Sequence, residues 1–321
     1  GGPAHVEPSV EYPTNTAGLS QQEQDLQQVL QSAKEQLAPT MTQLVDLIAI
    51  NELTGTLESD GDGVNANIVA ALPEESLSAQ AAEFQASTND DTIWIQIPNT
   101  NVDYPVVYKA GVENYAYYES LGYDKQYSKD GVIWADYECT FPELSQNTTL
   151  YGHNWYNIYT PRTLENMQSN DLMFSLVMSY HYTDFAQQNP FIYFSTTEQD
   201  YVFQVFAAFY TDLSFGYNFA NMTQEQTQQV IAEAKAKSRQ NYNVSVTSED
   251  KILTLSTCTY EFHEARFVIV ARKVRDGESE TVDTSQATMN PSPLYPDIWY
   301  QLFGGTKPDE AQLKAALHAG Q

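Results

Sequence analysis

The sequence Thr254-Leu255-Ser256-Thr257-Cys258 is a β-rich run that ends in a cysteine. Eight residues after that cysteine, Arg266 begins a second run of the same kind, Phe267-Val268-Ile269-Val270-Ala271. Apolar and β-branched residues in runs of this length indicate strands. The pattern therefore predicts a thiol at the end of one strand and a permanently charged cation at the start of the next.

Six earlier segments of the chain have the same strand-like composition. They span residues 93–97, 102–108, 131–136, 148–151, 191–195 and 201–210, and the two runs above extend over 251–257 and 266–274. A helix is predicted between the sixth and seventh strands, over 223–238, because Val230, Ile231 and Ala234 recur there at helical spacing. Its candidate N-cap is Asn221 or Thr223. Eight short strands with few helices favour a mainly β fold, a closed or nearly closed barrel, over a parallel doubly wound sheet.

Composition and periodicity divide the chain into four parts. Residues 1–18 are predicted to be a flexible leader or a cloning remnant, 19–87 an N-terminal helical segment, 88–275 the barrel, and 276–321 a C-terminal appendage. Within the second part, helices are predicted over 19–37 and 41–53. We expect a targeting segment to have been removed from the N-terminus.

The charge balance limits the classes of partner. The 321 residues include 42 acidic and 15 basic side chains, which gives a formal net charge of −27. Such an acidic excess disfavours nucleic acid, or an anionic membrane, as a partner bound through a basic surface. A solvated acidic exterior is one interpretation, and attraction of an amine-bearing substrate is another. No apolar run approaches the roughly 20 residues that a membrane span needs.

Cys258 is the candidate nucleophile. A cysteine at a strand end is often a buried packing residue, but Ser256, Thr257 and Arg266 surround this one with hydroxyls and a positive charge. A nearby cation favours the thiolate, which is the attacking form. Cys139 is interpreted as a small apolar filler. A disulfide between the two cysteines is the alternative, and it would abolish the nucleophile.

His153 is the candidate acid–base residue among five histidines. It follows a strand and a glycine in Leu150-Tyr151-Gly152-His153-Asn154. Its expected roles are to pair with the thiolate and to protonate the leaving amine. The remaining histidines are assigned to the leader, a structural position, a surface turn and the terminus: His5, His181, His263 and His318. The residues alone name no Asn or Asp that orients His153.

Arg266 has two interpretations. It could pair with Glu261 or Glu264, or it could stabilise the oxyanion of a tetrahedral intermediate, for which a guanidinium offers several donors and a constant charge. No metal site is supported, because Asp60-Gly61-Asp62-Gly63 has calcium-like spacing but lacks the downstream glutamate.

Together these motifs resemble the sortases, and class B most closely. The resemblance rests on Thr254–Cys258, Arg266 and Leu150–Asn154, and it extends over roughly 40–275. Further matching stretches are residues 101–107, 114–118, 131–137 and 250–255.

The resemblance implies an eight-stranded sortase-type barrel on the outer face of a Gram-positive membrane, held there by an N-terminal anchor. It implies a cysteine transpeptidase with Cys258 as nucleophile, His153 as general acid and base, and Arg266 as oxyanion and substrate clamp. Four residues are assigned to substrate binding: Ser256, Thr257, Asn154 and Tyr151. The helix over 223–238 and its preceding loop would form the wall of the sorting-motif cleft. Neither a metal nor another cofactor is expected.

The implied partners are secreted proteins with a C-terminal sorting motif and an acceptor amine. The leading acceptor is a peptidoglycan precursor, and the alternative is a lysine of a pilin subunit. A cysteine endopeptidase and a non-enzymatic binding module are further alternatives.

Overall fold

The structure is a computed structural model that describes residues 67–113, 115–157 and 161–319. The described residues form two compact units, one made of 67–294 and 308–319 and the other of 295–307. The leader over 1–18 and the helices predicted over 19–37 and 41–53 lie outside them. None of the described helices is long and apolar enough to cross a membrane.

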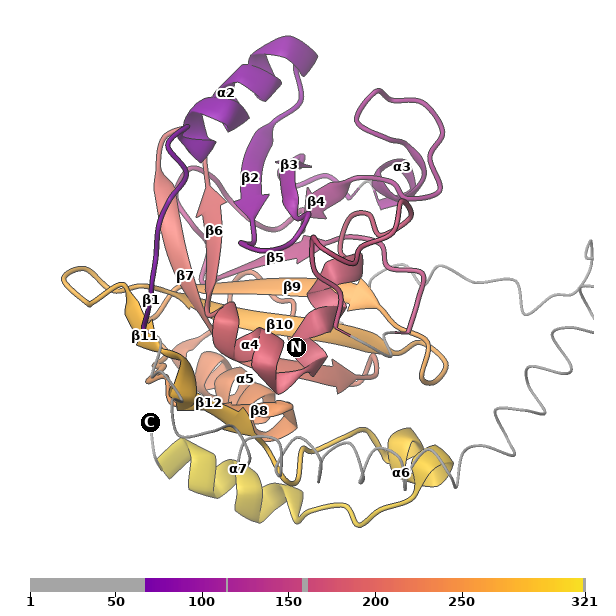
Figure 1. Cartoon of the computed structure of the whole chain (residues 1–321), viewed down its shortest axis with the longest axis vertical. Coiled ribbons are helices and arrows are strands. Elements are labelled where there is room, and N and C mark those ends of the chain that lie inside the picture. The colour runs from indigo at the N-terminus through magenta and orange to yellow at the C-terminus, as the bar shows by residue number, and fades with distance from the viewer. Residues whose placement is uncertain (1–66, 114, 158–160, 320–321) are drawn as a thin grey trace, which may run out of the picture. The chain divides into compact units, whose positions relative to one another are not determined.

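A closed barrel of eight strands forms the core of the first unit (Figure 1). In chain order the strands are β2 (Thr92–Gln96), β3 (Asp103–Val107), β4 (Ile133–Ala135), β5 (Asn147–Tyr151), β6 (Phe191–Ser195), β7 (Asp200–Thr211), β9 (Ile252–Cys258) and β10 (Arg266–Lys273). Around the barrel their order is β10-β7-β6-β2-β3-β4-β5-β9. The predicted mainly β, eight-stranded barrel is confirmed, and each predicted strand overlaps an observed one.

Two neighbouring pairs in the barrel are parallel, and the other six are antiparallel. β3 runs parallel to β4, and β5 runs parallel to β9. Since parallel neighbours point the same way, β5 and β9 end at the same edge of the barrel. The residues that follow β5 therefore lie beside the last residues of β9.

Helix α5 (Gln224–Lys237) lies between β7 and β9, the sixth and seventh barrel strands, as predicted. Thr223 is its N-cap and forms a capping box with Gln226, which satisfies N–H groups that the helix cannot bond itself. The apolar side of α5 packs on β7, β9 and β10. The shared cluster of buried side chains includes Phe206, Ala207, Phe209, Val230, Ile231, Ala234, Ile252, Val268 and Val270. Full burial of each large apolar side chain contributes about 1.5–3 kcal/mol relative to exposure.

Four helices that precede α5 in the first unit were not predicted individually, although the first of them falls almost entirely within the segment predicted to be helical, residues 19–87. They are α2 (Leu77–Thr88), α3 (Tyr115–Ser120), the 3₁₀ helix η1 (Ser175–His181) and α4 (Thr183–Gln188). Helix α2 begins after Ser76, whose hydroxyl accepts from the backbone N–H of Ala79. Only Leu77 and Ala81 of this helix are buried, so its sequence carries little apolar periodicity.

The appendage predicted over 276–321 contributes elements to both units. In the first unit β11 (Thr281–Asp283) pairs with β1 (Asn67–Val69), and β12 (Ala287–Met289) pairs with β8 (Gln240–Tyr242). The short helix η2 (Thr284–Gln286) joins β11 to β12, and α7 (Glu310–Ala319) packs against α5. The second unit holds α6 (Asp297–Phe303), where the rings of Tyr295 and Trp299 stack with centroids 4.1 Å apart. The domain boundaries at residues 87 and 275 stay predictions.

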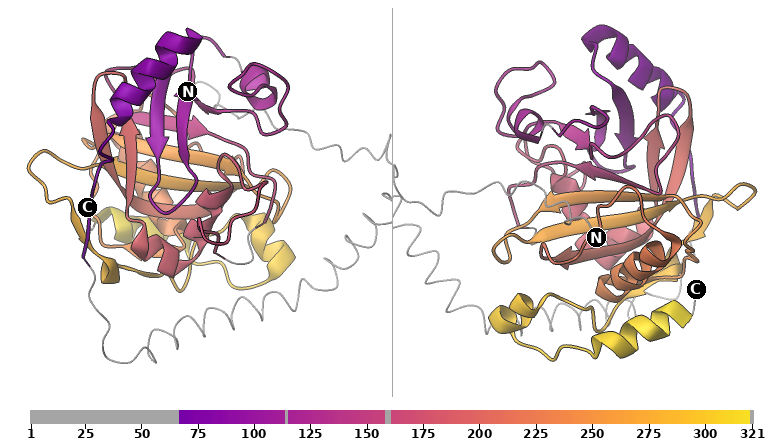
Figure 2. Two further views of the ribbon diagram at one scale, coloured as in Figure 1. Left: turned by 45° about the horizontal axis from the view of Figure 1, so that its top comes forward. Right: turned by 180° about the vertical axis from the view of Figure 1, so that it is seen from behind.

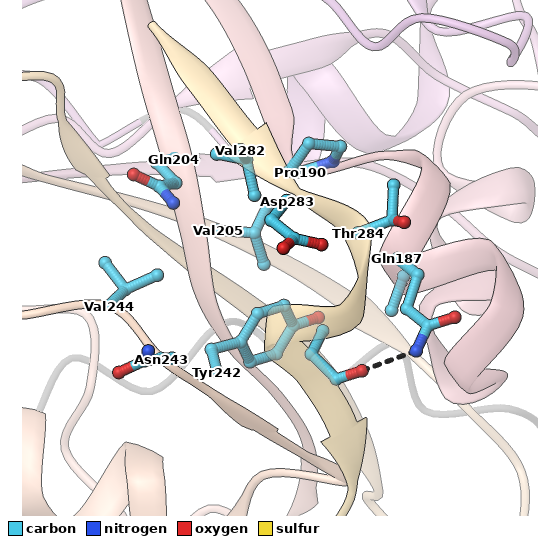
Figure 3. Close-up of a pocket in the computed structure, with 12 residues that line it drawn as sticks. Gln187, Pro190, Gln204, Val205, Tyr242, Asn243, Val244, Val282, Asp283 and Thr284 are labelled. Carbon is cyan, nitrogen blue, oxygen red and sulfur yellow. Dashed lines mark hydrogen bonds between the residues drawn. The ribbon is translucent and has the colours of Figure 1, made fainter. Parts of the chain in front are cut away.

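A small pocket lies between α4, β7 and the β8–β12 pair (Figure 3). Gln187 closes one side, because its Nε2 donates to the Ala287 carbonyl over 2.7 Å. The volume of about 10 Å³ is close to the minimum that holds one water molecule. None of the predicted site residues lines this pocket, so we assign no ligand to it.

Candidate active site

The register between β9 and β10 brings the predicted nucleophile and cation together. Cys258 lies directly opposite Arg266, and Ser256 lies opposite Val268. Directly opposed residues in an antiparallel pair project from the same face of the sheet. The thiol and the guanidinium therefore share the face on which α5 packs. Cys258 is partly exposed and, like Cys139, is not in a disulfide, so the predicted alternative of a disulfide is wrong.

The parallel pairing of β5 with β9 brings the third predicted residue to the same place. Tyr151 lies opposite Ser256 at the end of the ladder. The alignment continues beyond the strand, because the Gly152 N–H donates to the Ser256 carbonyl over 3.4 Å and the Thr257 hydroxyl donates to the Gly152 carbonyl over 2.7 Å. One residue further, this register places His153 beside Cys258.

The loop that follows His153 is tied to the loop that follows Cys258. Asn154 donates from Nδ2 to the carbonyl of Cys258 over 3.0 Å. Tyr260 donates from its hydroxyl to the Asn154 carbonyl over 2.7 Å and from its backbone N–H to Asn157 Oδ1 over 2.8 Å. These bonds hold the loop after His153 beside the loop after Cys258.

His153 is almost fully buried, and one of its ring nitrogens has a defined partner. Its Nε2 lies 3.0 Å from the backbone carbonyl oxygen of Glu119. A carbonyl only accepts hydrogen bonds, so Nε2 carries the proton and Nδ1 is the unprotonated nitrogen of the neutral ring. The ring also stacks on Trp155 with centroids 4.9 Å apart and planes at 17°. Trp155 is held in turn by Asp130, which accepts from its indole N–H over 3.0 Å.

The groups that orient His153 were missed by the sequence analysis. A backbone carbonyl leaves no signature in the sequence, since any residue at position 119 supplies one. Trp155 offered a signal, because a tryptophan two residues after a candidate histidine can stack on it. The stacking and the carbonyl do the orienting for which no Asn or Asp could be named.

Arg266 is buried at the start of β10, with 2% of its surface exposed. One guanidinium nitrogen donates to the Ala265 carbonyl over 3.2 Å. An arginine stays charged in such a position and offers several donors in one plane. His263, by contrast, is exposed and lies 3.9 Å from the Glu264 carboxylate, in agreement with the surface turn predicted for it.

All four residues predicted to bind substrate are buried. Ser256, Thr257, Tyr151 and Asn154 each expose 1% of their surface or less. Their side chains engage the protein: the Tyr151 hydroxyl donates to Asp136 over 2.8 Å, and the Ser256 hydroxyl lies 2.8 Å from that of Tyr217. The structure brings the four residues to the site, where they support the strand ends. Direct contact with substrate stays a prediction.

The segment between β7 and α5, residues 212–223, supplies side chains that the sequence analysis did not single out. Tyr217 bonds Ser256 as described, and Asn218 donates from Nδ2 to the Tyr151 hydroxyl over 3.0 Å. Both side chains are nearly buried against the strand ends. This segment has no helix or strand of its own, so no periodic pattern marks its residues.

The arrangement provides a thiol, an imidazole and a guanidinium at one edge of the barrel. These groups suit acyl transfer through a thioester, in which the cation stabilises the oxyanion and the imidazole moves protons. Among the described residues, no group of three or more His, Cys, Asp or Glu side chains is arranged to hold a metal ion.

Comparison with known proteins agrees with this chemistry. Residues 95–274 match the family of the Sortase domain. The chain is similar to Sortase B of Staphylococcus aureus, with 29% identity over 205 residues that cover 63% of this chain and 78% of that protein. The crystal structure of Staphylococcus aureus Sortase B superposes with a TM-score of 0.52 at 28% identity, covering 61% of this chain and 87% of that one. A crystal structure of Sortase B complexed with triglycine superposes with a TM-score of 0.53 at 27% identity, covering 63% and 88%. The chain therefore belongs to the sortase family, and it is a cysteine transpeptidase of the sortase B type.

Proposed function

We propose that the enzyme cleaves a C-terminal sorting motif of secreted proteins and transfers the acyl fragment to an amine of a peptidoglycan precursor. Transfer proceeds through a thioester on Cys258. The observation that carries the proposal is the strand pairing on both sides of β9. Arg266 of β10 lies opposite Cys258, and on the other side residues 151–153 are aligned beside 256–258.

In the first half-reaction the Cys258 thiolate attacks the carbonyl carbon of the scissile peptide bond. Negative charge develops on the carbonyl oxygen, and Arg266 stabilises it. As the C–N bond breaks, protonated His153 gives its proton to the departing amine, and the acyl group remains on sulfur. The Glu119 carbonyl holds Nε2–H in both protonation states, so Nδ1 is the nitrogen that gives up the proton.

In the second half-reaction an acceptor amine attacks the thioester carbonyl. His153, now neutral, takes a proton from the attacking nitrogen at Nδ1. The tetrahedral intermediate again places its negative oxygen at Arg266, and it collapses with release of the Cys258 thiolate. The protonated imidazole and the thiolate are restored, so the cycle balances without any cofactor.

A peptide amine of the cell wall is the acceptor that the comparisons favour. A structurally similar Sortase B forms a complex with triglycine, a short peptide with a free amino terminus. The strongly acidic chain, with a net charge of −27, also attracts a cationic amine over long range. We accordingly assign the enzyme to the outer face of the Gram-positive membrane, where secreted proteins meet peptidoglycan precursors.

Incubation of the enzyme with sorting-motif peptides and a panel of amines tests the proposal. The panel contains triglycine, a peptidoglycan stem peptide with a free side-chain amine, and a lysine peptide from a pilin. Mass spectrometry is expected to find the acyl fragment joined to a cell-wall amine. If the acyl fragment were joined only to the pilin lysine, the enzyme would be a pilin polymerase. If the peptide were hydrolysed and no added amine gave a joined product, the enzyme would be an endopeptidase. If no peptide were cleaved, the result would favour the alternative of a non-enzymatic binding module.

A further inference from the structure

Helix α7, near the C-terminus, packs along α5 (Figure 2). The resemblance to class B sortases implies that α5 and its preceding loop, residues 212–223, form the wall of the sorting-motif cleft. Lys314 on α7 forms two ion pairs. Its Nζ lies 2.6 Å from Glu310 on its own helix and 3.1 Å from Oε2 of Glu233 on α5. Glu233 thus connects the C-terminal helix to the middle of α5.

The other carboxylate oxygen of Glu233 faces a buried lysine. Lys237 Nζ lies 3.7 Å from Glu233 Oε1, one helical turn along α5, and the side chain of Lys237 is 7% exposed. Burial lowers the pKa of Lys237, and Lys314 adds to this, while the carboxylates of Glu233, Asp212 and Glu310 act in the opposite direction. A buried ammonium requires such partners, because an unpaired charge away from water is costly.

Lys237 also contacts the segment that precedes α5. Its ammonium lies over the ring of Phe215, 5.5 Å from the centroid. Phe215 packs on Tyr217 with ring centroids 5.9 Å apart, and the Tyr217 hydroxyl bonds Ser256, two residues before Cys258. A continuous series of contacts therefore leads from α7 to the strand that carries the nucleophile.

Residues 212–223 have no helix or strand of their own, so side-chain contacts of this kind contribute to holding the segment in place. We propose that α7 is a positioning element for the cleft wall, which it holds through the ion pairs Lys314–Glu233–Lys237 and the contact of Lys237 with Phe215. This inference rests on the proposed function, cleavage of a sorting motif, and on the expectation that the wall contacts that motif. It gives part of the C-terminal appendage a role in substrate binding.

Three full-length variants test the role of these ion pairs. Lys314→Met and Glu233→Gln each remove the ion pair between α7 and α5, whereas Lys314→Arg, a single conservative substitution, keeps it. We expect KM for the sorting peptide to rise about two- to fivefold in the first two, with kcat unchanged, since partly exposed ion pairs contribute modest free energies. The Arg variant should keep the wild-type KM. The first two substitutions change the net charge in opposite directions, so a common rise in KM separates positioning from long-range attraction.

Lys273→Met is the matched control. The side chain of Lys273 is as exposed as that of Lys314, 28%, and pairs with Asp276 at 3.5 Å, but neither Lys273 nor Asp276 belongs to α5, α7 or residues 212–223. Its KM should equal that of the wild type. Thermal unfolding and alkylation of Cys258 would show that each variant is folded with an accessible nucleophile.

Backbone hydrogen exchange provides a readout that does not need turnover. Exchange over residues 212–223 should be faster in Lys314→Met and Glu233→Gln than in Lys273→Met, because local opening becomes easier. Unchanged exchange in that segment, or KM values that follow the sign of the charge change, would overturn the inference. Wild-type protein that cleaves no sorting peptide would overturn the proposed function instead, and hydrogen exchange would still decide whether α7 holds the wall.

Discussion

The two cysteines of this chain lie near strand ends in very different surroundings. Cys139, in the turn after β4, is 1% exposed, and its sulfur lies 3.7 Å from the Asn147 carbonyl oxygen. Burial raises the pKa of the Cys139 thiol to about 12, and the nearby carboxylates of Asp136 and Glu138 act in the same direction. Cys258 is partly exposed and lies opposite Arg266 in the β9–β10 ladder.

The difference shows that the surroundings of a thiol, and not the residue type, decide whether it can be a nucleophile. Thiolate is the reactive form, and both access to solvent and a nearby positive charge promote its reaction. Cys139 has neither, and it is buried beside Asn147, the first residue of β5. Cys258 has both, together with a histidine brought alongside by the β5–β9 register.

Replacement of Cys258 should have the largest effect. Cys258→Ala removes the atom that carries the acyl group, so transpeptidation should fall by at least about 10⁴-fold, as for other enzymes that lose a nucleophile. Cys139→Ala is the control and should keep kcat/KM within about twofold of the wild type. Residual transfer in Cys258→Ala, measured by mass spectrometry of the joined product, would contradict the assignment of the nucleophile.

The second largest expected effect is the difference in alkylation rate between the two thiols of the native protein. At pH 8 a thiol with a pKa of about 12 is ionised in roughly one molecule in 10⁴, so folded Cys139 should react about 10³-fold more slowly than the same residue in unfolded protein. Iodoacetamide should therefore modify Cys258 alone, and peptide mapping would locate the label. Rapid labelling of Cys139 in the folded state would contradict the inference that burial suppresses the reactivity of this thiol.

The role of Arg266 can be measured against a second arginine on the same strand. Arg266→Gln should lower kcat/KM by about 10²-fold, because the oxyanion loses its cation. Arg272 is equally buried and donates to both Glu278 oxygens at the far end of β10. Arg272→Gln should lower the thermal stability and leave kcat/KM of the folded fraction unchanged. Equal kinetic losses in the two variants would assign Arg266 a structural role only.

Much of this site was readable in the sequence because its residues occupy the ends of strongly patterned strands. The predicted strand over 191–195 coincides with β6, and Thr223, one of two N-cap candidates, does cap α5. The parts that escaped prediction have no periodic signal. The Glu119 carbonyl is a backbone group, Tyr217 lies in an irregular segment, and β1, β8, β11 and β12 are strands of three residues each.

The smallest expected effect concerns the pH dependence of stability and arises from Cys139. In the unfolded chain this thiol ionises near pH 8.5, whereas burial in the folded protein delays ionisation until about pH 12. The unfolded state therefore loses its proton first, and the stabilising contribution is complete below about pH 8.5 and declines as pH rises towards 12. The slope from this one group approaches about 1.4 kcal/mol per pH unit. Burial also raises the pKa of Tyr123, Tyr180 and Tyr242, so these side chains add to the loss of stability at high pH.

The relevant quantity is therefore the difference between the wild type and Cys139→Ala in urea unfolding at pH 8, 9 and 10. We expect the wild type to be more stable at pH 8 and its advantage to shrink with each step. A constant advantage would mean that Cys139 ionises normally in the folded state, and the two cysteines would then differ in their neighbours but not in their access to water.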